Sequence, residues 1–344
     1  MTLWAVILAG GVGSRFWPLS TPQRPKQLLP LVDTEPLLVD TVRRLAPLVD
    51  AAHTLIITSA VVADAVRALL PDVPAANIVA EPRSAGTAPA LAWAAAEIER
   101  RDGPEATMLC VHADWAIAEP DAFRATLQRA GRAAARHESL VTVGVVPTRP
   151  DPGFGYIQPG EPVDGARRVE RFVEKPDRTT AERMVRDGYL WNSGIFAWRA
   201  GDFLDEIRAH TPEVAPALDC AAVGDAERFF ASVTSISVDH GVLERSARVL
   251  VLPGDFGWDD VGTWAALRRV RSRDAAGNAV AGDAQLVASH DNVVHAEGNT
   301  VVLYGVSDLV VVTRAGLTLV TTVERAADLK LLLDALPPAV RDMP

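Results

Sequence analysis

A glycine-rich segment that ends in a cation is the first candidate for chemistry. Residues 8–15 read Leu-Ala-Gly-Gly-Val-Gly-Ser-Arg and follow an apolar run. Glycines let backbone N–H groups approach a polyphosphate closely, and Arg15 can offer the phosphate oxygens a bidentate fork. The dinucleotide fingerprint would need glycine at Phe16 and a P-loop would need Gly-Lys-Ser/Thr, so neither motif is present. The pattern fits a phosphate-binding loop and a plain strand-to-helix turn equally well.

Lysine is nearly absent from the chain, which makes the few lysines informative. Of the 34 basic residues, only Lys26, Lys175 and Lys330 are lysines. A compact ammonium on a flexible stem serves where a planar guanidinium does not fit. Lys26 lies in Pro-Lys-Gln, close enough in sequence to reach back over a phosphate held by the glycine loop, and Lys175 follows Glu174 in Phe-Val-Glu-Lys-Pro. The alternative for each lysine is an ordinary solvated side chain.

Aspartates that follow buried strands are candidates for binding a divalent metal. The apolar run 107–111 leads almost directly to Asp114, and ligands of open α/β sheets bind beyond the carboxyl ends of strands. Asp259 and Asp260 stand between two tryptophans, where a tight turn can hold an acid rigidly. Mg²⁺ needs only one or two protein carboxylates when substrate phosphates supply other ligands. His112 stands without the pattern of a general base.

Glutamate and asparagine side chains provide a third group of candidates. Glu174 precedes Lys175, and Asn192 lies in Trp-Asn-Ser-Gly-Ile-Phe, which leads into an apolar run. Carboxylate and amide groups suit hydroxyl-rich ligands, and lysine suits a phosphate. Each signal alone is weak. Together with the glycine loop, they predict a site for two phosphorylated molecules, one with a polyphosphate tail and the other a sugar.

Apolar periodicity predicts the elements that must position these residues. Apolar runs bounded by turn residues predict buried strands, and segments with helical period lie between them. This alternation predicts an α/β fold with a largely parallel sheet covered on both faces. The predicted strands are 3–9, 54–58, 107–111, 140–146, 193–198 and 248–252, and the predicted helices are 37–49, 61–70, 88–100 and 121–136.

The C-terminal region has a different pattern. After a helix-like segment at 263–273, short β-rich runs follow too closely for helices between them, which predicts an all-β unit, either a short solenoid or a small sheet. Leucines at helical spacing in 324–336 predict a helix that caps it. We therefore predict a catalytic domain at 1–275 and a β-rich domain with a terminal helix at 276–344. The predicted C-terminal strands are 285–288, 292–295, 300–303, 309–313 and 317–321.

Composition excludes several classes of protein. With 344 residues, 49% hydrophobic and 23% charged, the chain has the composition of a folded protein of two domains or of one large domain with an appendage. A net charge of −10 argues against a nucleic-acid partner. Two distant cysteines, Cys110 and Cys220, predict neither disulfides nor zinc and favour the cytoplasm. The uncharged stretches are too short for a membrane span, and we expect no signal peptide.

In their order along the chain, these motifs resemble the mannose-1-phosphate guanylyltransferases, a branch of the sugar nucleotidyltransferases. The resemblance covers about residues 3–335. The Arg-Phe-Trp-Pro-Leu-Ser extension of the glycine loop and the Thr-Ala-Pro segment are its most specific parts. The matching segments are 8–20, 25–27, 81–82, 87–90, 113–114, 154–157, 172–176, 191–196 and 260–264.

The resemblance implies a Rossmann-like nucleotidyltransferase domain followed by a small left-handed β-helix-like unit. It implies Mg²⁺-dependent transfer of GMP from GTP to mannose 1-phosphate, which gives GDP-mannose and pyrophosphate. The implied catalytic residues are Arg15, Lys26, Asp114 and Asp260, of which Asp114 and Asp260 would bind Mg²⁺. The implied nucleotide-binding residues are Leu8, Gly10, Gly11, Gly13, Arg15, Lys26, Glu81, Thr87 and Asp114. The implied sugar-phosphate-binding residues are Gly155, Glu174, Lys175 and Asn192.

In the implied reaction, a sugar-phosphate oxygen attacks the α-phosphorus of GTP. That oxygen is already anionic, so no general base is required. We expect a homodimer, and no isomerase activity, because the chain ends where forms with a fused phosphomannose isomerase would continue. Two alternatives stay open: the same transfer to another sugar 1-phosphate, such as glucose or a heptose, and a catalytically silent sugar-nucleotide sensor.

Three departures from the family pattern concern the ligands. Many relatives read Pro-Ala-Asp-His where this chain reads His-Ala-Asp-Trp at 112–115, and many carry Arg-Asn where Ala85 and Gly86 precede Thr87. His240 stands where tyrosine is frequent. None of the three removes a carboxylate or a lysine that the chemistry needs. We expect them to affect base affinity and sugar preference more than catalysis.

Overall fold

The chain forms two compact units, and the computed structural model describes residues 2–11, 13–314 and 316–341. The first, called the sheet unit here, comprises Met1–Gly10, Val42–Ala113 and Glu119–Trp258. The second, the tail unit, comprises Gly11–Thr41, Asp114–Ala118 and Asp259–Pro344. The C-terminal strands thus share a unit with most of the glycine loop. The domain boundary at residues 275/276 stays a prediction.

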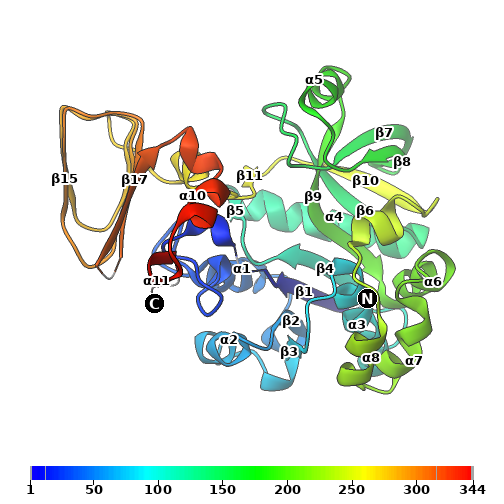
Figure 1. Ribbon diagram of the computed structural model, residues 1–344. Coiled ribbons are helices and arrows are strands. Elements are labelled where there is room, and N and C mark those ends of the chain that lie inside the picture. The colour runs from blue at the N-terminus through cyan, green and yellow to red at the C-terminus, as the bar shows by residue number, and fades with distance from the viewer. Residues whose placement is uncertain (1, 12, 315, 342–344) are drawn as a thin grey trace. The chain divides into compact units, whose positions relative to one another are not determined.

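A nine-stranded mixed sheet forms the centre of the sheet unit (Figure 1). Its order is β3-β2-β1-β4-β9-β6-β10-β8-β7, with β3, β2, β1 and β4 parallel to one another. Strand β9 runs antiparallel to both β4 and β6. The strands are β1 (Leu3–Ala9), β2 (Thr54–Ser59), β3 (Ile78–Glu81), β4 (Thr107–His112), β6 (Leu140–Val145), β7 (Tyr156–Val163), β8 (Ala166–Val173), β9 (Leu190–Arg199) and β10 (Val249–Gly254).

All six predicted strands of the α/β region exist, whereas the prediction of a largely parallel sheet holds only for part of it. The hairpin of β7 and β8 was not predicted, because most of its side chains are at least partly exposed and the sequence lacks an apolar run. Asp164 and Gly165 both have positive φ, 47° and 84°, as a two-residue hairpin turn of type I′ requires.

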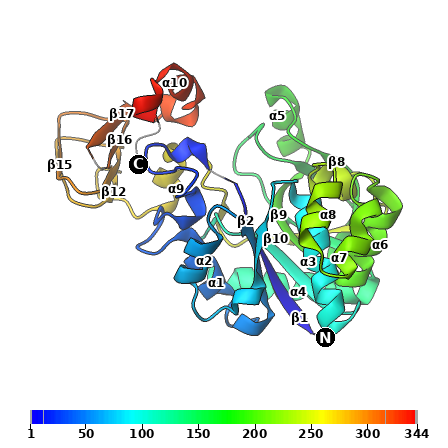
Figure 2. The same cartoon turned by 60° about the horizontal axis from the view of Figure 1, so that its bottom comes forward.

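Helices cover both faces of the sheet, because side chains alternate along each strand. Trp4 and Val6 of β1 belong to the cluster that includes the buried residues of α3, whereas Gly131 of α4 approaches Leu109 on the other face. Helix α3 is buried from Ala88 to Ile98, because α6 and α7 pack on it as well (Figure 2). Its alanines permit this close packing. No described helix has the length and apolar character that a membrane crossing requires.

The predicted helices of the α/β region all exist with shifted ends, and four more were missed. The helices here are α1 (Leu37–Leu45), α2 (Ala63–Leu69), α3 (Thr87–Asp102), α4 (Pro120–His137), α5 (Arg178–Arg186), α6 (Ala200–His210), α7 (Leu218–Ala222) and α8 (Ala226–Ser232). A π-helical turn, η6 (Asp239–Leu243), follows them. The short strands β5 (Ala116–Ile117) and β11 (Trp258–Asp259) complete this part of the chain.

The tail unit contains the predicted all-β region. Strands β12, β14 and β16 pair in parallel and β17 joins them antiparallel, while β13 and β15 form a second parallel pair. Such parallel stacking is that of a short solenoid. Asn292 continues the stack through its side chain, which donates to Asn278 Oδ1 at 3.0 Å. The strands are β12 (Ala279–Ala281), β13 (Ala284–Val287), β14 (Val293–Ala296), β15 (Val301–Tyr304), β16 (Leu309–Arg314) and β17 (Leu317–Thr322).

Two helices predicted in this region are shorter or interrupted. The segment 263–273 forms the 3₁₀ turn η7 (Trp264–Ala266) and α9 (Leu267–Val270). The terminal segment is divided into η8 (Arg325–Ala327), α10 (Lys330–Ala335) and α11 (Pro338–Arg341). The division falls at Asp328, whose carboxylate accepts from the Lys330 N–H at 3.1 Å and so begins a new helix.

The loop extension lies in the core of the tail unit. Phe16, Trp17 and Leu19 are buried together with Trp264, whose Nε1 donates to the Trp17 carbonyl at 3.0 Å. The Phe16 and Trp264 rings meet edge to face at 5.1 Å. Phe16 and Leu19 are fully buried, so these residues serve as core on which the glycine loop rests.

Candidate active site

The glycine loop is packed directly against the segment that carries Lys26. Gly13 has φ of 64°, and a Cβ there would lie 2.4 Å from the Lys26 Cβ, so only glycine fits. Gln27 Nε2 donates to the Gly11 carbonyl at 3.3 Å. Leu8, by contrast, is buried in the core of the sheet unit, and its carbonyl accepts from the Ala113 N–H. Its predicted nucleotide contact gains no support from this position.

Lys26 is buried and paired, not solvated. The residue is 6% exposed, and its Nζ donates to Asp114 Oδ2 at 2.9 Å and to the Asp260 carbonyl at 2.7 Å. The ammonium also lies 5.9 Å from the centre of the Phe16 ring. The structure thus joins three predicted catalytic residues from three distant segments around one positive charge.

The fourth predicted catalytic residue, Arg15, lies beside the same cluster. A Cβ at Gly262 would lie 2.5 Å from Asp260 Oδ2 and 3.4 Å from a guanidinium nitrogen of Arg15. Val261, which lies between Asp260 and Gly262 in the sequence, has φ of 46°, a strained value for a β-branched residue. Its side chain is fully buried. The turn therefore holds the Asp260 carboxylate in a fixed place near Arg15.

The structure also separates the two adjacent aspartates by role. Asp259 accepts from Arg269 at 2.7 and 3.0 Å and from the Val261 N–H at 2.9 Å, so it stabilises the turn. Asp260 presents its carbonyl to Lys26 and its carboxylate toward Gly262. Asp260 is thus the better candidate for a ligand contact.

Asp114 and Asp260 fit a hard cation such as Mg²⁺ by the chemistry of their donor atoms. Both offer carboxylate oxygens, and Lys26 contacts the Asp114 carboxylate and the backbone carbonyl of Asp260. Among the described residues, no group of three or more His, Cys, Asp and Glu side chains forms a metal-binding cluster. Two carboxylates suit a metal that takes its remaining ligands from substrate phosphates and water. The nucleotidyltransferase family generally uses a divalent metal.

In the sheet unit, Glu81 lies at the end of β3, beside the end of β1. A Cβ at Gly10 would lie 3.8 Å from Glu81 Oε2. Burial raises the pKa of Glu81 to about 7. The carboxyl group can therefore change its charge near neutral pH, and it faces the first glycine of the loop.

The segment before α3 explains one departure from the family pattern. Gly86 has φ of 86°, and a Cβ there would lie 2.4 Å from the Ile236 carbonyl oxygen, so a side chain is excluded. Ala85 accepts from the Ile236 N–H, and Thr87 Oγ1 accepts from the Val238 N–H at 2.8 Å. Thr87 thus ties 236–238 to α3, and the predicted nucleotide contact of its hydroxyl gains no support.

The predicted sugar-binding residues come together in the sheet unit. A Cβ at Gly155 would lie 2.6 Å from Glu174 Oε2 and 3.4 Å from Asn192 Cβ, and the Asn192 N–H donates to the Gly155 carbonyl at 2.8 Å. Lys175, with its side chain 64% exposed, pairs with Glu174 Oε1. All four predicted residues therefore form one cluster.

Sequence reasoning missed a fifth member of this cluster, Asp239. Asn192 Nδ2 donates to Asp239 Oδ1 at 2.8 Å. Burial, and then the negative charge of Glu174, raise the pKa of Asp239 to about 6. The available signal was its segment, which keeps the acidic positions of a family motif. The neighbouring His240 is exposed and contacts Ser237 Oγ at 3.2 Å.

Comparisons with known proteins identify the class to which the chain belongs. The nucleotidyl transferase family model matches residues 4–277, which defines the class of the protein. A mannose-1-phosphate guanylyltransferase of Salmonella typhimurium is 36% identical over 98% of this chain and 73% of its own length. One from Escherichia coli is 38% identical over 96% of this chain and 73% of its own length.

Solved structures point the same way. A Thermus thermophilus structure described as a mannose-1-phosphate geranyltransferase is 35% identical, with a TM-score of 0.89 over 97% of this chain and 99% of its own. A glucose-1-phosphate thymidylyltransferase from Bacillus anthracis shares the fold, with a TM-score of 0.51 over 78% of this chain and 94% of its own, at 20% identity. The chain belongs to the mannose-1-phosphate guanylyltransferase family of nucleotidyl transferases.

Proposed function

We propose that this enzyme transfers GMP from GTP to mannose 1-phosphate and so forms GDP-mannose and pyrophosphate. A phosphate oxygen of mannose 1-phosphate attacks the α-phosphorus, and the bond from that phosphorus to the pyrophosphate oxygen breaks. The attacking oxygen is anionic at neutral pH, so no proton has to be removed. Positioning and neutralisation of charge remain as the work of the protein.

The observation that carries the proposal is the buried ammonium of Lys26 beside the glycine loop. It bridges Asp114 and Asp260 while its own segment packs against Gly13. We propose that loop N–H groups and Arg15 bind the triphosphate and that Lys26 acts at the α-phosphate. Asp114 and Asp260 would hold Mg²⁺, which would neutralise triphosphate charge when bound.

The cluster in the sheet unit supports the sugar-phosphate half of the proposal. Glu174 and Asn192 offer a carboxylate and an amide to sugar hydroxyls, and Gly155 leaves them room. The exposed Lys175 ammonium is available to pair with the sugar phosphate. Glu81, which faces Gly10, is the candidate to accept hydrogen bonds from the N–H groups of guanine in its ionised form.

A pyrophosphate-release assay tests this proposal. Purified protein is incubated with each pairing of GTP, ATP, CTP, UTP or dTTP with mannose, glucose or heptose 1-phosphate, with Mg²⁺ or with a chelator. We expect turnover with GTP and mannose 1-phosphate in Mg²⁺ and none in the chelator. A different preferred sugar would correct the substrate. Absence of turnover with every pair would favour the alternative of a silent sensor.

We also propose that the tail unit mediates a homodimer and that the enzyme works in the cytoplasm, where its proposed substrates are made. Val302 and Val320 are 65% and 58% exposed, and Tyr304 is 77% exposed. These three residues line a hollow of about 570 Å³ on the C-terminal strands. Analytical ultracentrifugation of the protein and of Tyr304→Ser tests the proposal, and a monomeric wild-type protein would refute it.

A further inference from the structure

The Asn192 side chain is held from both sides by other side chains. Its Oδ1 accepts from Thr142 Oγ1 at 2.9 Å and from the Gly194 N–H at 3.4 Å, while its Nδ2 donates to Asp239 Oδ1 at 2.8 Å. The register between β6 and β9 shifts between Thr142 and Gly144, and Gly144 is paired with Asn192. Such an irregularity re-aims side chains, often next to active sites.

Of the two side-chain partners, only Asp239 distinguishes between the two orientations of the amide, and the Gly194 N–H, a donor at the longer distance of 3.4 Å, favours the same orientation. The Thr142 hydroxyl can donate or accept, so it would tolerate either end of the amide. An ionised Asp239 can only accept. A flipped amide would place its oxygen against this carboxylate oxygen at hydrogen-bond distance, where two lone pairs repel. Asp239 therefore determines which end of the Asn192 amide faces it.

We infer that Asp239 is a positioning residue of the proposed sugar site. It fixes the orientation of the Asn192 amide, so that the second N–H of this amide donates to a sugar hydroxyl. The same hydroxyl donates its own proton to the Glu174 carboxylate. Asn192 and Glu174 both approach Gly155, so one hydroxyl between them can serve both. The amide supplies a donor and the carboxylate an acceptor, which together recognise a hydroxyl and reject a group that lacks either function. This inference rests on the proposed function, because the ligand is the sugar 1-phosphate.

The local structure supports a specialised role for Asp239. It is the first residue of a π-helical turn, a rare conformation that is frequent at functional sites. Its segment is tied to α3 through Thr87 and Val238. The charged groups that act on it from the other elements are Glu174 and Lys175. Among the described residues, no arginine pairs with Asp239, and an acid placed beside another acid in this way is unfavourable for stability, which points to a role in binding.

The test measures coupling between Asp239 and individual sugar hydroxyls. Steady-state kinetics are recorded with mannose 1-phosphate and with its 2-, 3-, 4- and 6-deoxy analogues for the wild type and for Asp239→Asn. The matched control is Glu244→Gln, which removes a charge from an exposed acid of the same segment. GTP is kept saturating, and its KM is measured separately.

We expect Asp239→Asn to raise the KM for mannose 1-phosphate roughly 10- to 100-fold, the range for one charge-assisted hydrogen bond, while the KM for GTP stays within about threefold. One deoxy analogue should be strongly disfavoured by the wild type, and this discrimination should fall at least about fivefold in Asp239→Asn, at that position only. Glu244→Gln should behave as the wild type.

Two results would overturn the inference. One is an equal loss for every analogue in Asp239→Asn, as expected from a merely structural defect. The other is a KM for mannose 1-phosphate that does not change. If Asp239→Asn does not fold, Thr142→Val removes a hydrogen bond from the other end of the amide and should weaken the same discrimination. Lack of turnover by the wild type would instead refute the proposed function, so the two failures are distinct.

Discussion

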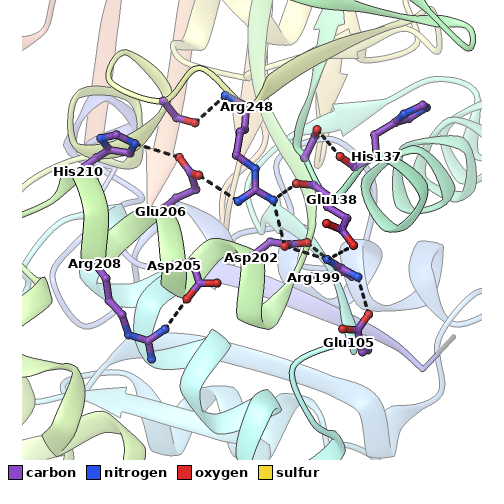
Figure 3. A network of polar contacts seen from close by, with 12 residues as sticks. Glu105, His137, Glu138, Arg199, Asp202, Asp205, Glu206, Arg208, His210 and Arg248 are labelled. Carbon is purple, nitrogen blue, oxygen red and sulfur yellow. Dashed lines mark hydrogen bonds and ion pairs between the residues drawn. The ribbon is translucent and has the colours of Figure 1, made fainter.

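Strand β9 carries a charged cluster at each end, and the two clusters are built differently. At its carboxyl end, Arg199 donates to both oxygens of Asp202, at 2.5 and 3.0 Å, and to Glu105 at 2.5 Å (Figure 3). Near its start, Asn192 is the neutral partner of Asp239, and among the described residues the cation in contact with Glu174 is the exposed Lys175. One end pairs acids with guanidinium groups, and the other leaves acids beside each other.

The pKa values follow this difference. The hydrogen bond to Asp202 and the nearby carboxylates raise the pKa of Arg199 above its usual range. Arg248 adds contacts to Asp202 at 3.2 Å and to Glu206 at 3.3 Å, so two buried acids share two cations. The pKa of Asp239 is raised instead, because burial and Glu174 disfavour its charge. The first cluster holds helix α6 to the sheet, whereas the second consists of the residues proposed to bind the sugar phosphate.

Lys26 tests this comparison with the largest expected effect, because it is as buried as the acids of the first cluster, while its proposed role, like that of the second cluster, is to bind a ligand. We expect Lys26→Gln to lower kcat roughly 30- to 1000-fold, since loss of a buried charge-assisted contact costs about 2–4 kcal/mol. Steady-state kinetics and urea unfolding are compared with Lys330→Gln, an exposed lysine of the tail unit. A large decrease in the free energy of unfolding, with an unchanged kcat for the protein that remains folded, would show that Lys26 has a structural role like that of Arg199.

Arg199 tests whether the cluster at the carboxyl end of β9 stabilises the fold without affecting substrate binding. Arg199→Met leaves Asp202, which is 8% exposed, with fewer cations, and we expect the free energy of unfolding to fall by about 2–4 kcal/mol. The KM values should not change. The control is Arg208→Met, which breaks an exposed pair with Asp205 and should change stability little (Figure 3). An altered KM for either substrate in Arg199→Met would contradict the division between the two ends.

Glu81 tests whether a buried acid that is proposed to bind a ligand lowers the stability of the fold. Its folded pKa of about 7 lies above the ordinary 4.5, so the folded protein binds this proton more tightly than the unfolded chain. The stability that neutral Glu81 contributes is present below about pH 4.5 and is lost as the pH rises toward 7. We expect Glu81→Gln to be about 2–3 kcal/mol more stable than the wild type at pH 8 and equal to it at pH 4.5.

Urea unfolding of both proteins across this pH range measures the Glu81 effect. The same variant should raise the KM for GTP if Glu81 contacts guanine. A constant stability difference at every pH would mean that titration of Glu81 is not its cause. An unchanged KM with the expected pH dependence would remove Glu81 from the nucleotide site and leave the electrostatic argument intact.

Periodicity and chemistry in the sequence predicted part of this molecule. Buried strands such as β1 and β4 are continuous apolar runs, and the fold brings the motifs around Lys26 and Asp114 together in one cluster. The β7–β8 hairpin has no apolar run to reveal it. The burial of Phe16 depends on packing against Trp264, far away in the sequence. Asp239 was missed because only the fold brings its carboxylate to Asn192, and no local pattern encodes that distance.

Substitution of Lys175 is expected to change the kinetics least, because Lys175 is the most exposed of the four residues proposed to bind the sugar phosphate. Its backbone has φ of 47°, uncommon for a residue with a side chain, which fixes where the side chain leaves the chain. We expect Lys175→Gln to raise the KM for mannose 1-phosphate roughly tenfold, with the KM for GTP and the stability nearly unchanged.

Kinetics with each substrate varied at a saturating concentration of the other measure the effect of Lys175→Gln. Lys175→Arg should recover only part of the loss, because a guanidinium needs a fixed bidentate geometry. Equal shifts in both KM values would show that Lys175 does not distinguish the sugar phosphate from the triphosphate. The cluster at the start of β9 would then contain no residue assigned to binding the phosphate.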